Sequence, residues 1–195
     1  DKVHIIVQRQ YNCLHRTLMP LLEENNIEFL PFGSLNKEQK EYVKTYFNTT
    51  LYPILTPMAI DNSRPFPLLA NKSLNLIVEL SGEHKEEKFA VVQVPSVVPR
   101  IVKLPSEDGK CQLIFLEEIV RAYINKLFNA NEVLSAYCFR VTRDADLEID
   151  EEDSHDLLIE IEDSIKQRKW GAPVRLEVDK DICQDSFDFL TEQLE

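Results

Sequence analysis

The chain has 195 residues, of which 44% are hydrophobic, and it carries a formal net charge of −12. The apolar content supports a sizeable core and excludes intrinsic disorder, and no run of eighteen apolar residues exists to span a membrane. The acidic total argues against nonspecific binding of nucleic acid. Without a secretory leader, the sequence predicts a cytoplasmic protein of one large domain, with or without a docked extension. Because it begins at Asp1 and ends within an amphipathic run (187–195), we expect a fragment of a longer protein.

The first fifty residues predict helices. Apolar residues between Val7 and Leu22 follow a helical spacing, and Pro20 is expected to kink or restart that helix near Met19. Residues 27–30 form a short extended run. A second helix is expected over 36–51, because Asn36 and Gln39 have the spacing of a capping box. Its inward-facing residues are expected to be Tyr42, Val43, Tyr46, Phe47 and Leu51.

A proline-rich block follows over residues 52–75. Four of the ten prolines fall within fifteen residues, with apolar side chains between them. Each proline fixes its own φ and disfavours the helical conformation of the residue before it. The block can therefore be neither a long helix nor a central strand, and its apolar content predicts a rigid, packed connection.

The second half of the chain mixes strands and helices. Strands are expected at 74–80 and 89–94 around a polar tip at 82–88, and at 101–104 and 112–116 around a turn at Asp108-Gly109. Further elements are a helix at 116–128, a strand at 136–141, a helix at 154–169 and a strand at 174–178. Two consecutive hairpins favour an α+β fold: a mostly antiparallel sheet with flanking helices and an N-terminal helical lead-in.

These elements predict three segments along the chain. Residues 1–52 are the helical lead-in, interpreted as the end of a preceding helical domain. Residues 53–183 form the main domain, and residues 184–195 begin the next segment.

Common catalytic motifs are missing. The four glycines stand at 33, 82, 109 and 171, so neither a P-loop nor a dinucleotide fingerprint can be built. The four cysteines lie at least 27 residues apart, which argues against a zinc knuckle and predicts reduced, mostly buried thiols. No Gly-rich loop, cysteine pair or other familiar pattern identifies a reaction.

An acidic stretch from Asp144 to Asp163 holds eleven of the 34 acidic residues and no Lys or Arg, which leaves 23 acids against 22 bases elsewhere. Within it, the carboxylates of Asp144, Asp146, Glu148 and Asp150 alternate and would share one face of an extended strand, as a magnesium or calcium site needs. The calcium-loop pattern fails, because Ile149 occupies the position of its invariant glycine. The favoured interpretation is a solvated strand end before the acidic N-terminus of the helix at 154–169, so no metal site is predicted.

Three blocks, in order, resemble the middle, or head, domain of bacterial polyphosphate kinases. They are residues 52–75, which include the run Tyr-Pro-Ile-Leu-Thr-Pro-Met, then Phe-Arg-Val-Thr-Arg-Asp-Ala-Asp-Leu at 139–147, and Gly-Ala-Pro-Val-Arg-Leu-Glu-Val at 171–178. The resemblance covers nearly the whole chain. It implies an enzyme that reversibly transfers the terminal phosphate of ATP to inorganic polyphosphate, through a phosphohistidine and with Mg²⁺.

The resemblance also implies a division of labour. The family's histidine nucleophile belongs to C-terminal domains with His-x-Lys-type signatures. The four histidines of this chain, at 4, 15, 84 and 155, are each followed two places later by Ile, Thr, Glu or Leu. This fragment therefore lacks the catalytic histidine, and no ATP or Mg²⁺ is expected to bind to it alone. Its implied roles are scaffold, wall of a substrate tunnel and subunit contacts in a homo-oligomer, a dimer or tetramer, with peripheral association at the inner membrane.

Basic residues within the family-like blocks are the candidate contacts for substrate. Guanidinium and ammonium groups in an otherwise acidic chain bind phosphate oxygens well. Arg64 and Lys72 are expected to line a phosphate or nucleotide path, and Arg140 and Arg143 are further candidates. Each could instead form an ordinary salt bridge, and the adjacent Arg143-Asp144 and nearby Arg175 and Glu177 are the most evident pairs.

Two other functions fit the residues. The chain could be a noncatalytic interaction module of another multidomain protein, with the acidic stretch as its docking surface. The chain could also be a metal-dependent hydrolase that uses the alternating carboxylates, a function that ranks below the kinase and below the interaction module.

Overall fold

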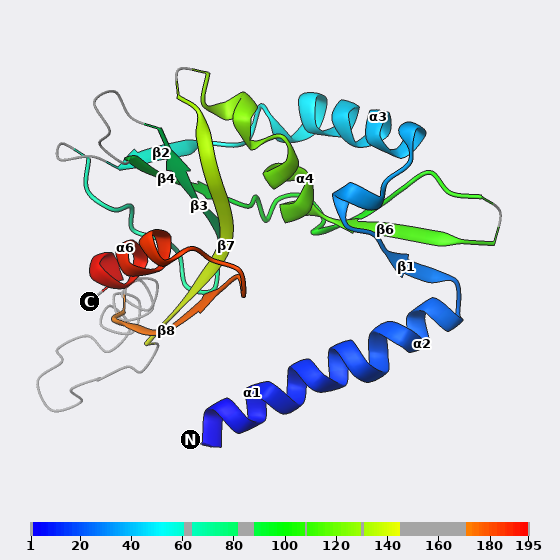
Figure 1. Cartoon of the computed structure of the whole chain (residues 1–195), viewed down its shortest axis with the longest axis horizontal. Coiled ribbons are helices and arrows are strands. Elements are labelled where there is room, and N and C mark those ends of the chain that lie inside the picture. The colour runs from blue at the N-terminus through cyan, green and yellow to red at the C-terminus, as the bar shows by residue number, and fades with distance from the viewer. Residues whose placement is uncertain are drawn as a thin grey trace, which may run out of the picture. The chain divides into compact units, whose positions relative to one another are not determined.

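The computed structural model describes residues 2–60, 64–81, 88–107, 109–129, 131–144 and 171–194 (Figure 1). The chain divides into two compact units: unit 1 comprises residues 1–53 and 96–122, and unit 2 comprises residues 54–95 and 123–195. The expected hairpin tip at 82–87, most of the acidic stretch and the expected helix at 154–169 lie outside the described residues. The three segments expected from sequence stay a prediction.

Unit 1 begins with three consecutive helical segments, which we call the helical rod. Its parts are α1 (Lys2–Cys13), the π-helical turn η1 (Leu14–Leu18) and α2 (Met19–Glu24). The backbone N–H of Met19 bonds to the carbonyl oxygen of Leu14, and Pro20 stands in the first turn of α2, where its missing N–H is tolerated. The restart near Met19 is confirmed, although the helix begins at Lys2, before the expected Val7.

The second helix consists of α3 (Lys37–Tyr46) and the π-helical turn η3 (Phe47–Leu51). Val43, Phe47 and Leu51 are fully buried, as expected. Tyr42 is 41% exposed, so its predicted inward position is wrong. The reason is geometrical: residues 43, 47 and 51 follow one another at four-residue intervals along the buried face, and Tyr42 precedes that row by one residue.

The capping box at the start of α3 is confirmed. The Asn36 side chain accepts a hydrogen bond from the backbone N–H of Gln39 at 2.9 Å, and the Asn36 N–H donates to the Gln39 side chain at 3.1 Å. We expect Asn36→Ala to lower the free energy of urea unfolding by about 1 kcal/mol, because one N-terminal donor loses its partner. Asn36→Ser, which retains a capping oxygen, should restore most of the loss; equal losses in both variants would contradict the capping role.

Unit 1 also contains a three-stranded sheet. Its order is β1-β6-β5, with β1 (Ile27–Phe29) parallel to β6 (Cys111–Phe115) and β5 (Ile101–Lys103) antiparallel to it. A short 3-10 turn, η2 (Phe32–Ser34), precedes α3. The second expected hairpin is therefore confirmed, and α4 (Leu116–Ala122) follows β6 directly. The expected helix at 116–128 ends earlier than predicted, since Ile124–Leu127 form a separate 3-10 turn, η5.

Unit 2 is built on a five-stranded antiparallel sheet of order β2-β4-β3-β7-β8. Its strands are β2 (Pro57–Ile60), β3 (Leu74–Leu80), β4 (Lys88–Gln93), β7 (Val133–Arg143) and β8 (Pro173–Val178). The proline-containing part of the block, residues 53–67, contributes the edge strand β2, which begins at a proline, and the central strand β3 starts only at Leu74, beyond the last of these prolines. The α+β class with a mostly antiparallel sheet is confirmed, and β7 is longer than expected.

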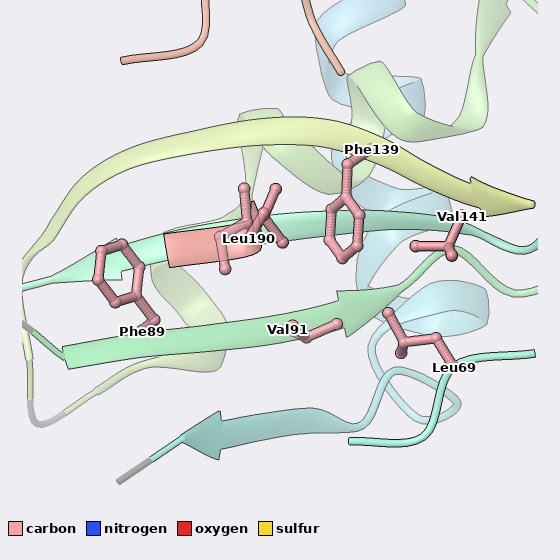
Figure 2. Close-up of a cluster of buried hydrophobic side chains, with 7 residues drawn as sticks. Leu69, Phe89, Val91, Phe139, Val141 and Leu190 are labelled. Carbon is pink, nitrogen blue, oxygen red and sulfur yellow. The ribbon is translucent and has the colours of Figure 1, made fainter. Parts of the chain in front are cut away.

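The core of unit 2 lies between one face of this sheet and α6 (Gln184–Leu194) (Figure 2). Leu190 of α6 is fully buried, beside Phe139 and Val141 of β7 and Ile77 of β3. Since side chains alternate along a strand, residues 140 and 142 of β7 point to the opposite face of the sheet. This alternation decides which side chains of β7 and β8 are available for binding.

Two further expectations concern the surface. Cys13 is exposed and Cys111, Cys138 and Cys183 are half-buried, so the prediction of mostly buried thiols is wrong. Among the described residues, no helix combines the length and the apolar character needed to cross a bilayer.

Candidate functional site

The backbones of three of the four predicted site residues lie close together where the loop before β3 lies against the end of β7. The backbone N–H of Lys72 donates to the Val141 carbonyl at 2.8 Å, and the N–H of Arg143 donates to Asn71 Oδ1 at 2.9 Å. Arg140 lies directly opposite Leu74 in the antiparallel register. We call Lys72, Arg140 and Arg143 the basic corner. Arg64 is exposed, and none of the contacts described for the corner involves it.

Lys72 stands in a tight turn. Its φ is 61°, in the left-handed region that non-glycine residues seldom adopt. The turn is closed by the N–H and the hydroxyl of Ser73, which both bond to the carbonyl of Ala70, at 3.1 and 2.8 Å. The backbone of Lys72 is thus fixed by hydrogen bonds on both sides, while its side chain remains exposed to solvent.

Arg143 differs from its neighbours, because its side chain is 7% exposed. Its Nε donates to the carbonyl of Leu69 at 3.0 Å and its Nη1 to the carbonyl of Gly171 at 3.0 Å. These bonds tie the end of the proline-rich block to the segment that enters β8. The recorded partners of the guanidinium are main-chain carbonyls, and the simple pair with Asp144 considered from sequence is not among them.

The entry to β8 passes very close to β7. The backbone N–H of Asp144 donates to the Ala172 carbonyl at 2.8 Å, and a Cβ added to Gly171 would lie 2.1 Å from the Asp144 carbonyl oxygen. Only glycine permits this approach. Arg143 and Gly171 together therefore set the position of β8 beside the basic corner.

Arg140 and Arg175 lie on the face of β7 and β8 that points away from α6. In register, Arg140 is opposite Glu177, and Thr142 is opposite Arg175. The pair expected between Arg175 and Glu177 is present, with Nη2 3.0 Å from Oε1. The Nε of Arg140 is buried and has no hydrogen-bond partner within the described part of the chain. Sequence reasoning set Arg175 aside as paired and overlooked Thr142; the signal was the two-residue alternation along both strands.

A second polar cluster lies on the opposite face of the same sheet. Ser135 donates to Glu79 Oε2 at 2.8 Å, and the Cys183 thiol donates to the same oxygen at 3.7 Å. Burial is the main cause that raises the pKa of Tyr137 above its usual 10.0, and the neighbouring Cys183 and Glu79 raise this pKa further. The cluster joins β3, β7 and the segment before α6 through hydrogen bonds.

The raised pKa of Tyr137 predicts a pH dependence of stability. The folded chain keeps the phenol proton at pH values where the unfolded chain loses it, so the stabilisation is complete below pH 10.0 and lost as pH rises through the folded pKa. We expect Tyr137→Phe to flatten the decline of unfolding free energy with pH above about pH 10. Urea unfolding at a series of pH values tests this, and identical slopes in the two proteins would contradict it.

The side chains of the corner suit some of the groups that the resemblance implies and not others. The guanidinium of Arg140 and the ammonium of Lys72 suit phosphate oxygens, whereas Mg²⁺ requires oxygen ligands such as carboxylates. Among the described residues, no three His, Cys, Asp or Glu side chains lie close enough to hold a metal ion. The alternating carboxylates at 146, 148 and 150 lie outside the described residues. The described residues of the corner therefore suit phosphate oxygens better than a metal ion.

Comparison with known proteins places this geometry in a family. The model of the polyphosphate kinase middle domain matches residues 38–195. The chain belongs to the polyphosphate kinase family. The match covers all of the basic corner and leaves out the helical rod, β1 and η2.

Individual relatives agree with this assignment. The chain is 48% identical over 186 residues to a polyphosphate kinase of Lactiplantibacillus plantarum, covering 94% of this chain and 26% of the relative. It is 37% identical to one of Pseudomonas putida, covering 99% and 27%. The crystal structure of polyphosphate kinase from Porphyromonas gingivalis shares the fold, with a TM-score of 0.75 at 24% identity over 98% of this chain and 28% of that one. The chain thus spans about a quarter of these polyphosphate kinases.

Proposed function

We propose that this chain serves as the middle domain of an enzyme that reversibly transfers the terminal phosphate of ATP to inorganic polyphosphate. The match to the middle-domain model over residues 38–195 carries this proposal. Family membership also separates it from the two alternatives, an unrelated interaction module and a metal-dependent hydrolase. In the proposed enzyme, the phosphohistidine, ATP and Mg²⁺ belong to polypeptide outside these 195 residues, and Mg²⁺ neutralises phosphate charge during transfer.

The contribution of this chain is to position substrate rather than to make or break bonds. An ammonium group at Lys72 and a guanidinium at Arg140 attract phosphate oxygens by charge and hydrogen bonding. Arg143 holds the surrounding backbone through its two carbonyl contacts. We place Arg64, Lys72, Arg140 and Arg143 along the phosphate path in these different roles, with Arg143 acting through its neighbours.

An interface role for the lead-in is supported by its exposed apolar side chains. On α1, η1 and α2, seven large apolar residues are between 39% and 64% exposed: Val3, Ile5, Ile6, Tyr11, Leu14, Leu18 and Leu21. An apolar surface of this extent marks a contact with other polypeptide. We propose that it packs against a helical domain of the full-length kinase. We also propose that the full-length kinase assembles into a dimer or tetramer. It would lie in the cytoplasm and contact the membrane peripherally.

The test uses the full-length kinase that contains this chain. Arg64→Ala with Lys72→Ala should raise KM for polyphosphate about tenfold with little change in kcat, and should weaken the salt dependence of KM, because two exposed charges are lost. The matched control is Lys44→Ala, whose exposed ammonium pairs with Glu41 on α3. Unchanged elongation and unchanged salt dependence in the double variant would remove these two residues from the path.

A second test uses the 195-residue chain alone with ATP, Mg²⁺ and polyphosphate. We expect no polymer synthesis and no acid-labile phosphohistidine, because the nucleophile is proposed to lie elsewhere. Self-phosphorylation of the isolated chain would contradict the proposed division of labour.

A further inference from the structure

The face of β7 and β8 that points away from α6 carries a charge pattern of which the proposed roles use only Arg140. We call it the outer β7–β8 face. Phe139 and Val141 pack in the core on the other side of β7, as do Leu176 and Val178 of β8. By strand alternation, the outer face consists of Ala136, Cys138, Arg140, Thr142, Arg175 and Glu177.

The register brings two guanidinium groups of this face within reach of one ligand. Arg140 is opposite Glu177, and Thr142 is opposite Arg175, so the two arginines are diagonal neighbours. Diagonal residues on adjacent antiparallel strands have Cα atoms about 7–8 Å apart. That spacing lies well within the reach of two arginine side chains that converge on a single anion, and Thr142 lies on the same face, opposite Arg175.

The charges on this face do not balance. Of the six described residues that make up the outer β7–β8 face, Glu177 is the one acid, and it forms an ion pair with Arg175 at 3.0 Å. Arg140 keeps a buried Nε without a hydrogen-bond acceptor in the described residues. A buried donor without an acceptor is unfavourable, and one of charged type more so. Among the described residues, the face therefore has one positive charge without a carboxylate partner, and this charge includes a buried donor that lacks an acceptor.

The chemistry of the ligand follows from the donors. Guanidinium groups form paired hydrogen bonds with phosphate oxygens, and the hydroxyl of Thr142 adds a neutral donor. None of the six residues of the outer face offers an aromatic ring on which a nucleobase could stack. The face therefore fits a chain of linked phosphates better than a nucleotide.

We propose that Arg140, Arg175 and Thr142 bind a condensed phosphate chain on the outer β7–β8 face, and that Glu177 competes with this anion for Arg175. The inference rests on the proposed function and deepens it, because it assigns the phosphate contact to a pair that includes Arg175. It requires no bond to form or break, since the phosphate chain is only bound.

The test measures binding of tripolyphosphate to the 195-residue chain by calorimetry at low salt. Arg140→Gln and Arg175→Gln should each weaken binding about tenfold, because each removes a charged donor. Glu177→Gln should tighten binding several-fold by removing the competing carboxylate. The matched control is Lys180→Gln, which removes a 90% exposed charge of the same unit just beyond β8 and should change nothing. Thermal unfolding of each variant confirms that it is folded.

Several outcomes would overturn the inference: no binding by the wild-type chain, full binding by both arginine variants, or an equal loss in Lys180→Gln, which would indicate nonspecific attraction. A nucleotide site would be indicated instead if ATP, titrated in the same way, bound the chain more tightly than tripolyphosphate. Binding by the chain is measured without any turnover. A kinase that fails to synthesise polymer would therefore contradict the proposed function and leave this result intact.

Discussion

Replacing Gly171 with alanine is expected to lower the free energy of unfolding by about 3 kcal/mol or more. The new Cβ would lie 2.1 Å from the carbonyl oxygen of Asp144 and 3.0 Å from its carbonyl carbon, both of them backbone atoms. Relief requires β7 and the start of β8 to separate, which breaks the 2.8 Å bond from the Asp144 N–H to the Ala172 carbonyl. Urea unfolding followed by circular dichroism measures the loss.

The matched control for this variant is Gly33→Ala. Nothing lies within 4 Å of a Cβ at Gly33, so we expect a change within about 0.5 kcal/mol. If Gly171→Ala proved as stable as Gly33→Ala, the close approach of the two strands would be refuted.

Replacing Arg143 with methionine is expected to cost about 3 kcal/mol of stability. Methionine retains the apolar stem but leaves the carbonyls of Leu69 and Gly171 without their recorded donor. Arg143→Lys should recover only part of the loss, because a single ammonium cannot reproduce the fork of a guanidinium. The measurement is again the unfolding free energy in urea.

Lys44→Gln is the control for Arg143→Met. Its ammonium group is exposed and pairs with Glu41 at 3.3 Å, an interaction worth less than about 1 kcal/mol. A loss in Arg143→Met no larger than in this control would mean that the buried hydrogen bonds contribute little. Arg143 would then again be a candidate for direct contact with substrate.

Local patterns in the sequence predicted most of the secondary structure. The runs rich in Val, Ile and Phe that became β3 and β4, and the capping box at Asn36, are local signals that depend only on neighbours in the chain. The α+β class followed from the same patterns. Errors arose at element ends and at single faces, as with Tyr42, because a one-residue offset on a helix separates a buried position from an exposed one.

The candidate site was predictable only in part. The sequence identified basic residues in the family-like blocks, and the backbones of Lys72, Arg140 and Arg143 lie close together. It could not show that Arg143 turns inward to two carbonyls, because those acceptors are main-chain atoms brought close by folding. Nor could it place Arg175 diagonal to Arg140, since the register between β7 and β8 depends on a pairing across more than thirty residues.

The parallel pairing of β1 with β6 has a consequence for anyone who excises the middle domain. The family model begins at residue 38, so a protein trimmed there would lack β1. The outer side of β6 would then become an open edge, prone to pair with other chains and aggregate. A polar relay would also be severed, because Gln112 donates to Glu28 at 2.7 Å and accepts from Gln39 at 2.7 Å. Truncation should therefore begin upstream of Asn26, whose carbonyl accepts the first bond of this pairing, from Cys111.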